Sequence, residues 1–89
     1  MAEREEELEI RILFFAKARE LVNVSSAAIR VPNSQITEDQ LLTLIELKFP
    51  ELKVLKRGFV LALNEEYAGG TLNLKSGDEI AIIPPISGG

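Results

Sequence analysis

The sequence contains no cysteine and no histidine, which removes most of the side chains that proteins use for catalysis near neutral pH. Without cysteine there is no disulfide, no thiolate nucleophile and no sulfur ligand for a metal. Without histidine the chain lacks the usual acid–base group and the commonest metal ligand, and its serines have no histidine to activate them. The composition therefore argues against an independent hydrolase or metalloenzyme and predicts no metal site and no bound cofactor.

Long apolar runs and clusters of basic residues are also missing. No apolar stretch approaches the length of a membrane span, and the acidic segment at residues 1–7 has no signal-peptide core, so we expect a cytoplasmic protein with no membrane partner. The formal net charge of −4 argues against nucleic acid as a partner. The 89 residues, 46% apolar and 27% charged, suffice for one small globular domain.

The apolar pattern predicts an α+β domain over residues 8–83, between a flexible acidic extension (1–7) and a functional tail (84–89). The first and last strands are long and apolar, so they are expected to pair in the middle of one sheet. The second strand is expected at an edge. Strands are predicted over residues 8–15, 25–31, 59–63, 71–74 and 79–83, a short helix over 16–22, and a linker over 51–58.

The clearest element is a helix that follows Thr37 and ends at Phe49. Thr37 is a favourable N-cap residue, and Gln40 completes a capping-box pattern three residues later. Apolar residues then recur at helical spacing, and Pro50 disfavours helical geometry at Phe49. We expect this helix to cover one face of the sheet.

The other face of the sheet has no second long helix to cover it. Leu13, Phe15 and Ile83 occupy this face if the alternate residues of the same strands point to the core. An exposed apolar patch of this kind marks a docking surface. We therefore predict docking at the root of the tail, with partial cover by residues 16–22 as the alternative.

The tail at residues 84–89 reads Pro-Pro-Ile-Ser-Gly-Gly and directly follows an apolar strand. Its two glycines lack a Cβ and can pass through a narrow channel, whereas its two prolines favour a stiff, extended root. From Ile83 the tail can reach about 20 Å, far enough to enter another protein's active site. The predicted reactive group is the carboxylate of Gly89, and a frayed end without function is the alternative.

The order of elements and the Gly-Gly ending resemble the ubiquitin-like β-grasp family, and shorter segments make the resemblance more specific. Residues 13–21 (LFFAKAREL) are similar to the opening strand and turn of the small subunit of molybdopterin synthase. Residues 76–81 (SGDEIA) and 83–89 (IPPISGG) resemble that family's closing segment. The resemblance spans residues 8–89 and implies a mixed sheet of four to five strands with one main helix packed on one face.

The resemblance implies a sulfur carrier in molybdenum cofactor biosynthesis, not an enzyme. An ubiquitin-activating-type adenylyltransferase would use ATP to activate Gly89, because an ionised carboxylate is a poor electrophile. A sulfurtransferase would then convert the acyl-adenylate to a thiocarboxylate. The large catalytic subunit, in an assembly of two small and two large subunits, would receive the tail and use the sulfur to convert cyclic pyranopterin monophosphate to molybdopterin.

The resemblance also assigns individual residues. Gly89 would carry the sulfur, Gly88 would give clearance in the channel, and the inserted tail would include Pro84, Pro85, Ile86 and Ser87. Apolar partner contacts would be made by Phe15, Tyr67 and Ile83, to which strand alternation adds Leu13. Arg19 matches the opening motif and would form a salt bridge to a partner, with a solvated Arg19 as the alternative.

Three other functions would use the same features. A sulfur carrier for thiamine synthesis or tRNA thiolation would have the same terminal chemistry and a different docking surface. A protein modifier would form an isopeptide bond through Gly89. A non-covalent β-grasp binding module would have an inert tail.

Overall fold

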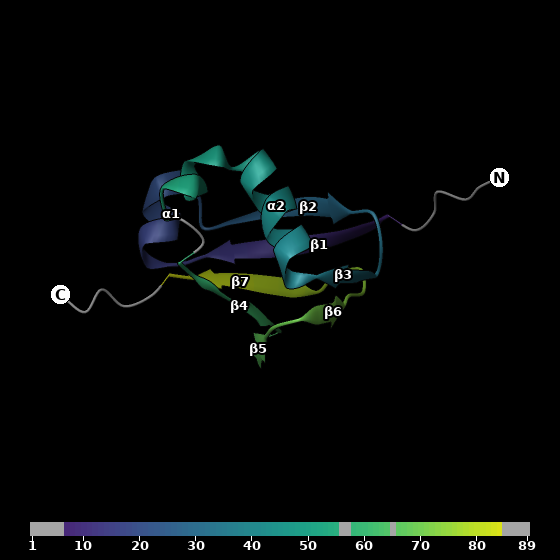
Figure 1. Ribbon diagram of the computed structural model, residues 1–89. Helices are drawn as coiled ribbons and strands as arrows, with labels where there is room; N and C mark the ends of the chain where they lie inside the picture. Colours follow the sequence, from purple (N-terminus) through teal and green to yellow (C-terminus); the bar gives the residue numbers. More distant parts are fainter. Residues whose placement is uncertain (1–6, 56–57, 65, 85–89) are drawn as a thin grey trace.

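A five-stranded sheet in the order β2–β1–β7–β4–β5 forms the centre of the computed structural model, which describes residues 7–55, 58–64 and 66–84 (Figure 1). The first and last strands along the chain, β1 and β7, pair in parallel in the middle of the sheet, and all other neighbouring strands are antiparallel. The predicted central pairing and the edge position of β2 are confirmed. The strands are β1 (Leu8–Phe14), β2 (Ser26–Val31), β4 (Val60–Leu63), β5 (Glu66–Ala68) and β7 (Glu79–Ile83).

Helix α2 (Glu38–Lys48) crosses one face of this sheet (Figure 1). The Thr37 hydroxyl accepts a hydrogen bond of 3.1 Å from the Gln40 backbone N–H, and the Gln40 side chain accepts one of 3.0 Å from the Thr37 backbone N–H. This is the predicted capping box. The helix gives way at Phe49 to Pro50, as the proline predicts, and the short helix α1 (Ala16–Val22) lies where the sequence places it.

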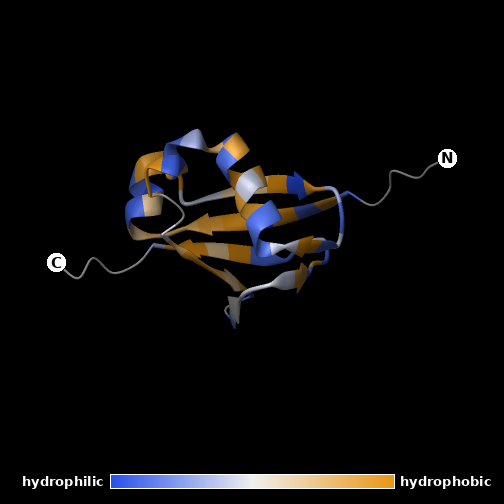
Figure 2. Ribbon diagram, in the orientation of Figure 1, coloured by the Kyte–Doolittle hydropathy of each residue, from blue (hydrophilic) through white to orange (hydrophobic). Residues whose placement is uncertain are grey.

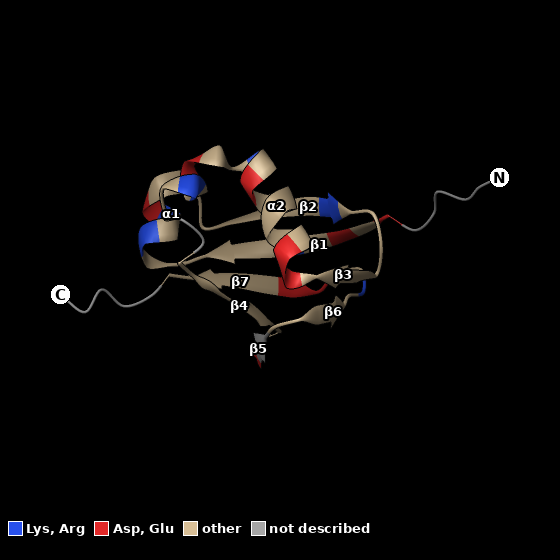
Figure 3. Ribbon diagram, viewed as in Figure 1, with Lys and Arg blue, Asp and Glu red and all other residues tan. Residues whose placement is uncertain are grey.

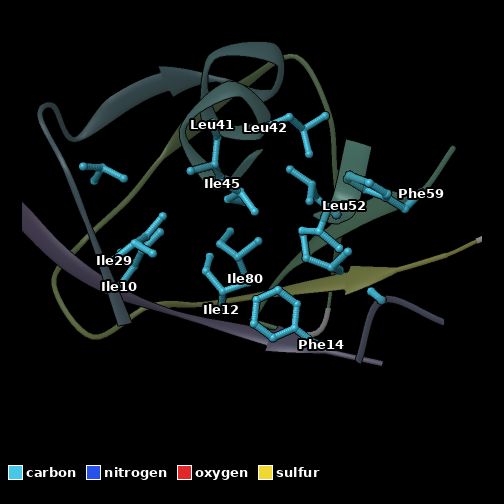
Figure 4. Packing of buried hydrophobic residues seen from close by; sticks show 14 of the residues in the cluster. Ile10, Ile12, Phe14, Ile29, Leu41, Leu42, Ile45, Leu52, Phe59 and Ile80 are labelled. Atoms are coloured by element: carbon cyan, nitrogen blue, oxygen red, sulfur yellow. The ribbon is translucent and has the colours of Figure 1, made fainter. Parts of the chain in front are cut away.

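The core fills the space between α2 and the sheet (Figure 4). Ile12 of β1 and Ile80 of β7 are paired neighbours and fully buried, with Leu41 and Ile45 of α2 packed above them. Burial of each such aliphatic side chain contributes about 1.5–3 kcal/mol. The ring of Phe14 meets that of Phe49 edge-on, with 5.0 Å between centroids and an interplanar angle of 74°.

Three short elements depart from the sequence-based prediction. The expected linker after α2 begins with a 3₁₀ helix, η2 (Pro50–Leu55), and β5 occupies part of what was expected to be a turn. Strand β6 (Thr71–Asn73) pairs with β3 (Gln35–Thr37) in a separate two-stranded sheet. Three-residue strands are too short for alternation to reveal, and their pairing is decided by contacts distant in sequence.

A buried carboxylate ties together the end of the sheet at which β7 begins. Asp78 is only 6% exposed, and its carboxylate accepts hydrogen bonds from the Lys75 backbone N–H at 2.8 Å and from the Asn64 side-chain amide at 3.2 Å. The Asn64 side-chain oxygen in turn accepts a 3.0 Å hydrogen bond from the Glu79 backbone N–H. The turn after β4 is thereby fixed to the start of β7.

Replacing Asp78 with alanine is expected to lower the free energy of unfolding by about 1–3 kcal/mol, because the Lys75 N–H and the Asn64 amide lose their acceptor. Urea unfolding followed by circular dichroism measures the change. Glu79→Ala is the matched control, since the side chain of Glu79 is exposed and its backbone N–H remains. Equal stability of the two variants would show that the hydrogen bonds of Asp78 contribute nothing net.

Candidate functional site

The face of the five-stranded sheet opposite α2, called the open face below, is apolar at the end where β7 finishes. Phe15 and Val60 are each 46% exposed on it. Figure 2 shows apolar residues along β1, β7 and β4, and Figure 3 shows charge on β7 only at its start. This end of the sheet therefore presents an uncharged apolar surface. Its members, placed by alternation along the strands, are Leu13, Phe15, Val60, Ala62, Ala81 and Ile83.

The strand register arranges these residues in rows across the sheet. Leu13 of β1 pairs with Ala81 of β7, and Ala81 pairs with Ala62 of β4. The same row continues into β5, where the backbone of Tyr67 pairs with that of Ala62; the side chain of Tyr67 lies outside the described part of the structure. The docking role of Tyr67 stays a prediction.

Phe15 is held at the rim of the open face by its own backbone. It is the N-cap residue of α1, and its carbonyl accepts hydrogen bonds from the backbone N–H groups of Ala18 at 3.0 Å and Arg19 at 3.3 Å. Ala16, with φ of 51°, has the left-handed conformation that turns the chain from β1 into α1. The Phe15 side chain is about half exposed, so α1 covers it only in part at most. Partial cover by residues 16–22 was the alternative that the sequence analysis gave.

Arg19 lies beside this rim, in an open hollow of about 590 Å³ that is also lined by Ala16 and Glu20. Within the described residues its guanidinium group makes no ion pair, whereas Lys17 on the same helix meets Glu20 at 3.7 Å. An exposed guanidinium can bind a carboxylate of a partner through paired hydrogen bonds. The choice between a salt bridge and a solvated Arg19 stays open.

The root of the tail is embedded in the domain. Strand β7 ends at Ile83, which pairs with Val60 of β4. Pro84 directly follows the strand and is buried, and its predicted place in the inserted tail stays a prediction. The remaining predicted tail residues lie outside the described residues, namely Pro85, Ile86, Ser87, Gly88 and Gly89.

Sequence reasoning placed Leu13, Phe15 and Ile83 on the open face and missed Val60 and Ala62. Their strand was predicted without assigning its two faces. The two faces of this strand could have been assigned from the sequence. In the segment FVLAL the large residues Phe59, Leu61 and Leu63 alternate with the smaller Val60 and Ala62, so the large residues belong on the core face. What could not be read was the pairing of β4 with β7, which brings Val60 beside the root of the tail.

The described residues present an apolar surface beside the end of β7. They contain no group of three or more acidic side chains arranged to hold a metal ion. No helix within residues 7–55, 58–64 and 66–84 is long and apolar enough to cross a membrane. A flat apolar face beside the root of a chain end is suited to contact with another protein.

Known proteins are similar to this chain both in sequence and in fold. The sequence model of the ThiS family matches residues 12–89. A molybdopterin synthase sulfur carrier subunit from Arabidopsis thaliana is 46% identical over 82 residues, which cover 92% of this chain and 84% of the relative.

Two solved structures have the same architecture. Small archaeal modifier protein 1 of Haloferax volcanii superposes with a TM-score of 0.76 at 20% identity, covering 89% of this chain and 99% of that one. A chain from the complex of subunits 1 and 2 of the molybdopterin-converting factor of Helicobacter pylori gives a TM-score of 0.66 at 23% identity, covering 92% and 100%. The predicted ubiquitin-like β-grasp fold is confirmed.

Replacing Ala16 with glycine is expected to raise the free energy of unfolding by about 0.5–1 kcal/mol, because glycine adopts positive φ without a steric penalty. Thermal or urea unfolding measures the change. Ala28→Gly in edge strand β2, where φ is not positive, is the matched control and should lower stability. If both variants were destabilised alike, Ala16 would carry no strain.

Proposed function

Since this chain belongs to the ThiS family, we propose that it acts as the sulfur carrier subunit of a molybdopterin synthase. The observation that carries the proposal is the position of the open face, which surrounds the point where β7 passes into the Gly-Gly tail. The 46% identity to the Arabidopsis thaliana sulfur carrier subunit supports this pathway over other uses of the fold. The chain is then a cytoplasmic, non-catalytic subunit whose partners supply the catalytic groups.

The open face is the proposed contact with the large subunit. A solved complex of the two subunits of a molybdopterin-converting factor contains a chain of the same fold, which supports a partner of this kind. Phe15 and Val60 supply the most exposed side chains, and Leu13, Ala81 and Ile83 are half-buried beside them. Tyr67 extends the contact and Arg19 pairs with a partner carboxylate at its rim.

The proposed chemistry takes place at Gly89. Its carboxylate is ionised at neutral pH and a poor electrophile, so it attacks the α-phosphate of ATP on the activating enzyme and pyrophosphate leaves. The terminal sulfur of a persulfide on a sulfurtransferase then attacks the acyl carbon and AMP leaves, and a thiol reduces the resulting acyl disulfide, which releases the thiocarboxylate and leaves a disulfide between the thiol and the sulfurtransferase. Two carriers that bear the thiocarboxylate donate in succession the two sulfurs of molybdopterin. They do so within an assembly of two small and two large subunits.

Incubation with ATP, the activating enzyme and a sulfur donor is expected to raise the intact mass of this chain by the difference between sulfur and oxygen, localised to Gly89. A variant lacking Gly89 should fold and bind the large subunit but transfer no sulfur. Sulfur transfer by the shortened variant would contradict the mechanism. Isopeptide conjugates of the chain in cell extracts would instead identify a protein modifier.

Phe15→Asp and Val60→Asp are each expected to weaken binding to the large subunit about tenfold or more, because a carboxylate must be desolvated in an apolar contact. Aspartate is also a favourable N-cap residue, so the first variant keeps its helix start. Leu47→Asp on α2, 71% exposed on the opposite side, is the control and should bind normally. Calorimetric titration that found all three variants alike would exclude the open face as the contact.

A further inference from the structure

One long edge of the five-stranded sheet has no strand beside it within the described residues. Strand β2 runs for six residues along this edge, whereas β5, at the opposite edge, has three. Figure 1 shows β1 on one side of β2 and no strand on its other side. An open hollow of about 430 Å³ beside β2, lined by Ala28 and by Lys48 of α2 among others, leaves this edge accessible. An edge strand of this kind offers its unpaired backbone groups to another chain.

The hydrogen bonds of β1 show which backbone groups of β2 point away from the sheet. The Phe14 N–H donates to the Ser25 carbonyl at 2.9 Å, and hydrogen-bonded and non-bonded pairs alternate from there along the register of the two strands. Arg11, which lies opposite Ala28, follows this pattern, because its N–H donates at 2.9 Å to the Asp78 carbonyl on the β7 side. The residues of β2 whose N–H and C=O groups point outward are therefore Ser26, Ala28 and Arg30.

The outward edge of β2 lacks the devices that usually keep edge strands apart, which include proline, bulges and lysine side chains. Its sequence, SAAIRV, contains neither proline nor lysine, and its register with β1 runs without a break. The strand begins with the small uncharged residues Ser26, Ala27 and Ala28. Its one cation, Arg30, lies near its end, and the guanidinium group is 3.4 Å from the Glu7 carboxylate. A second extended chain can therefore approach β2 along most of its length.

We propose that β2 pairs antiparallel with β2 of a second copy of this chain, about a twofold axis at Ala28. In this register Ala28 faces Ala28 of the second copy, and Ser26 faces Arg30. Each of these pairs can exchange two backbone N–H···O bonds, which uses the outward groups of all three residues. The two five-stranded sheets then form one continuous sheet.

Charge and strand length select this register over its neighbours. A twofold axis at Arg30 would set two guanidinium groups directly opposite each other, and like charges in that position are destabilising. An axis at Ser26 would set the end of β2 against residues that precede the strand. With the axis at Ala28, each Arg30 faces an uncharged serine and keeps Glu9 as its neighbour on β1 of its own copy.

The side chains on the core side of β2 fit the same register. Ala27 is half-buried at the border of the hydrophobic core, and Ile29 is buried in it. Pairing about Ala28 places Ala27 opposite Ile29 of the second copy, and residues directly opposite each other point to the same face of a sheet. The apolar layer therefore continues across the joint between the two copies.

This pairing leaves the proposed contact with the large subunit free. It uses the outer edge of β2, whereas Val60 and Ile83 of the open face lie on β4 and β7, beyond β1. The two β7 strands finish at opposite ends of the joined sheet, because the paired strands run in opposite directions. An edge contact buries less than the area of about 1,200–2,000 Å² typical of stable complexes. We therefore expect a monomer–dimer equilibrium with a Kd between about 10 μM and about 1 mM.

The test places charges at the twofold axis. Ala28→Asp and Ala28→Lys each set two like charges directly opposite each other, so each variant alone is expected to be monomeric. An equimolar mixture of the two variants should associate at least as strongly as the native chain, because opposite charges then face each other. Sedimentation velocity of the full chain at concentrations up to about 1 mM measures the association. A salt concentration of about 0.15 M screens the net charge of −4 on each copy.

The side chain of Ala28 is exposed, so both variants should keep the fold, which circular dichroism checks. Thr71→Asp and Thr71→Lys are the matched controls at an exposed position of β6, which belongs to the other sheet, and should associate as the native chain does, alone or mixed. A native chain that stays monomeric up to about 1 mM would overturn the proposal. So would Ala28 variants that associate normally by themselves, or a mixture that associates no better than its components.

Discussion

The parallel pairing of β1 with β7 is the contact on which the rest of the molecule depends. It joins the first and last strands at the centre of the sheet, with Ile12 opposite Ile80 and Phe14 opposite Ile82. Because the two strands run the same way, they finish at the same end of the sheet. Because Phe14 pairs with Ile82, Phe15 and the end of β7 follow directly at the same end of the sheet, although most of the chain separates them in sequence.

The central strands are apolar on both faces at that end, a pattern typical of strands buried on both sides. Within the described part of the chain the only long helix is α2, which covers one face of the sheet, so the second face has no helix of this length over it. A partner subunit would supply the missing layer. In the proposed function this chain would provide a surface and a reactive end, and its partners would provide the catalytic groups.

Local signals in the sequence were enough for the larger elements. The capping box of Thr37 and Gln40 fixed the start of α2, and alternation located β1, β2 and β7, because both signals depend on residues a few positions apart. Strand β6 was predicted, but its partner β3 was missed, because Gln35 and Asn73 meet only after the chain has folded back. Strand β5 and helix η2 were missed because both are short.

The sequence by itself determined the composition of the tail, the lack of cysteine and histidine, and the apolar side chains Leu13, Phe15 and Ile83, which are exposed or half-buried on the open face. Only the tertiary structure decided that Val60 and Ala62 join them, since this depends on the register of β4 against β7. It also decided that Pro84 is buried. A sequence records which residues are apolar, whereas burial depends on neighbours that long-range pairing brings together.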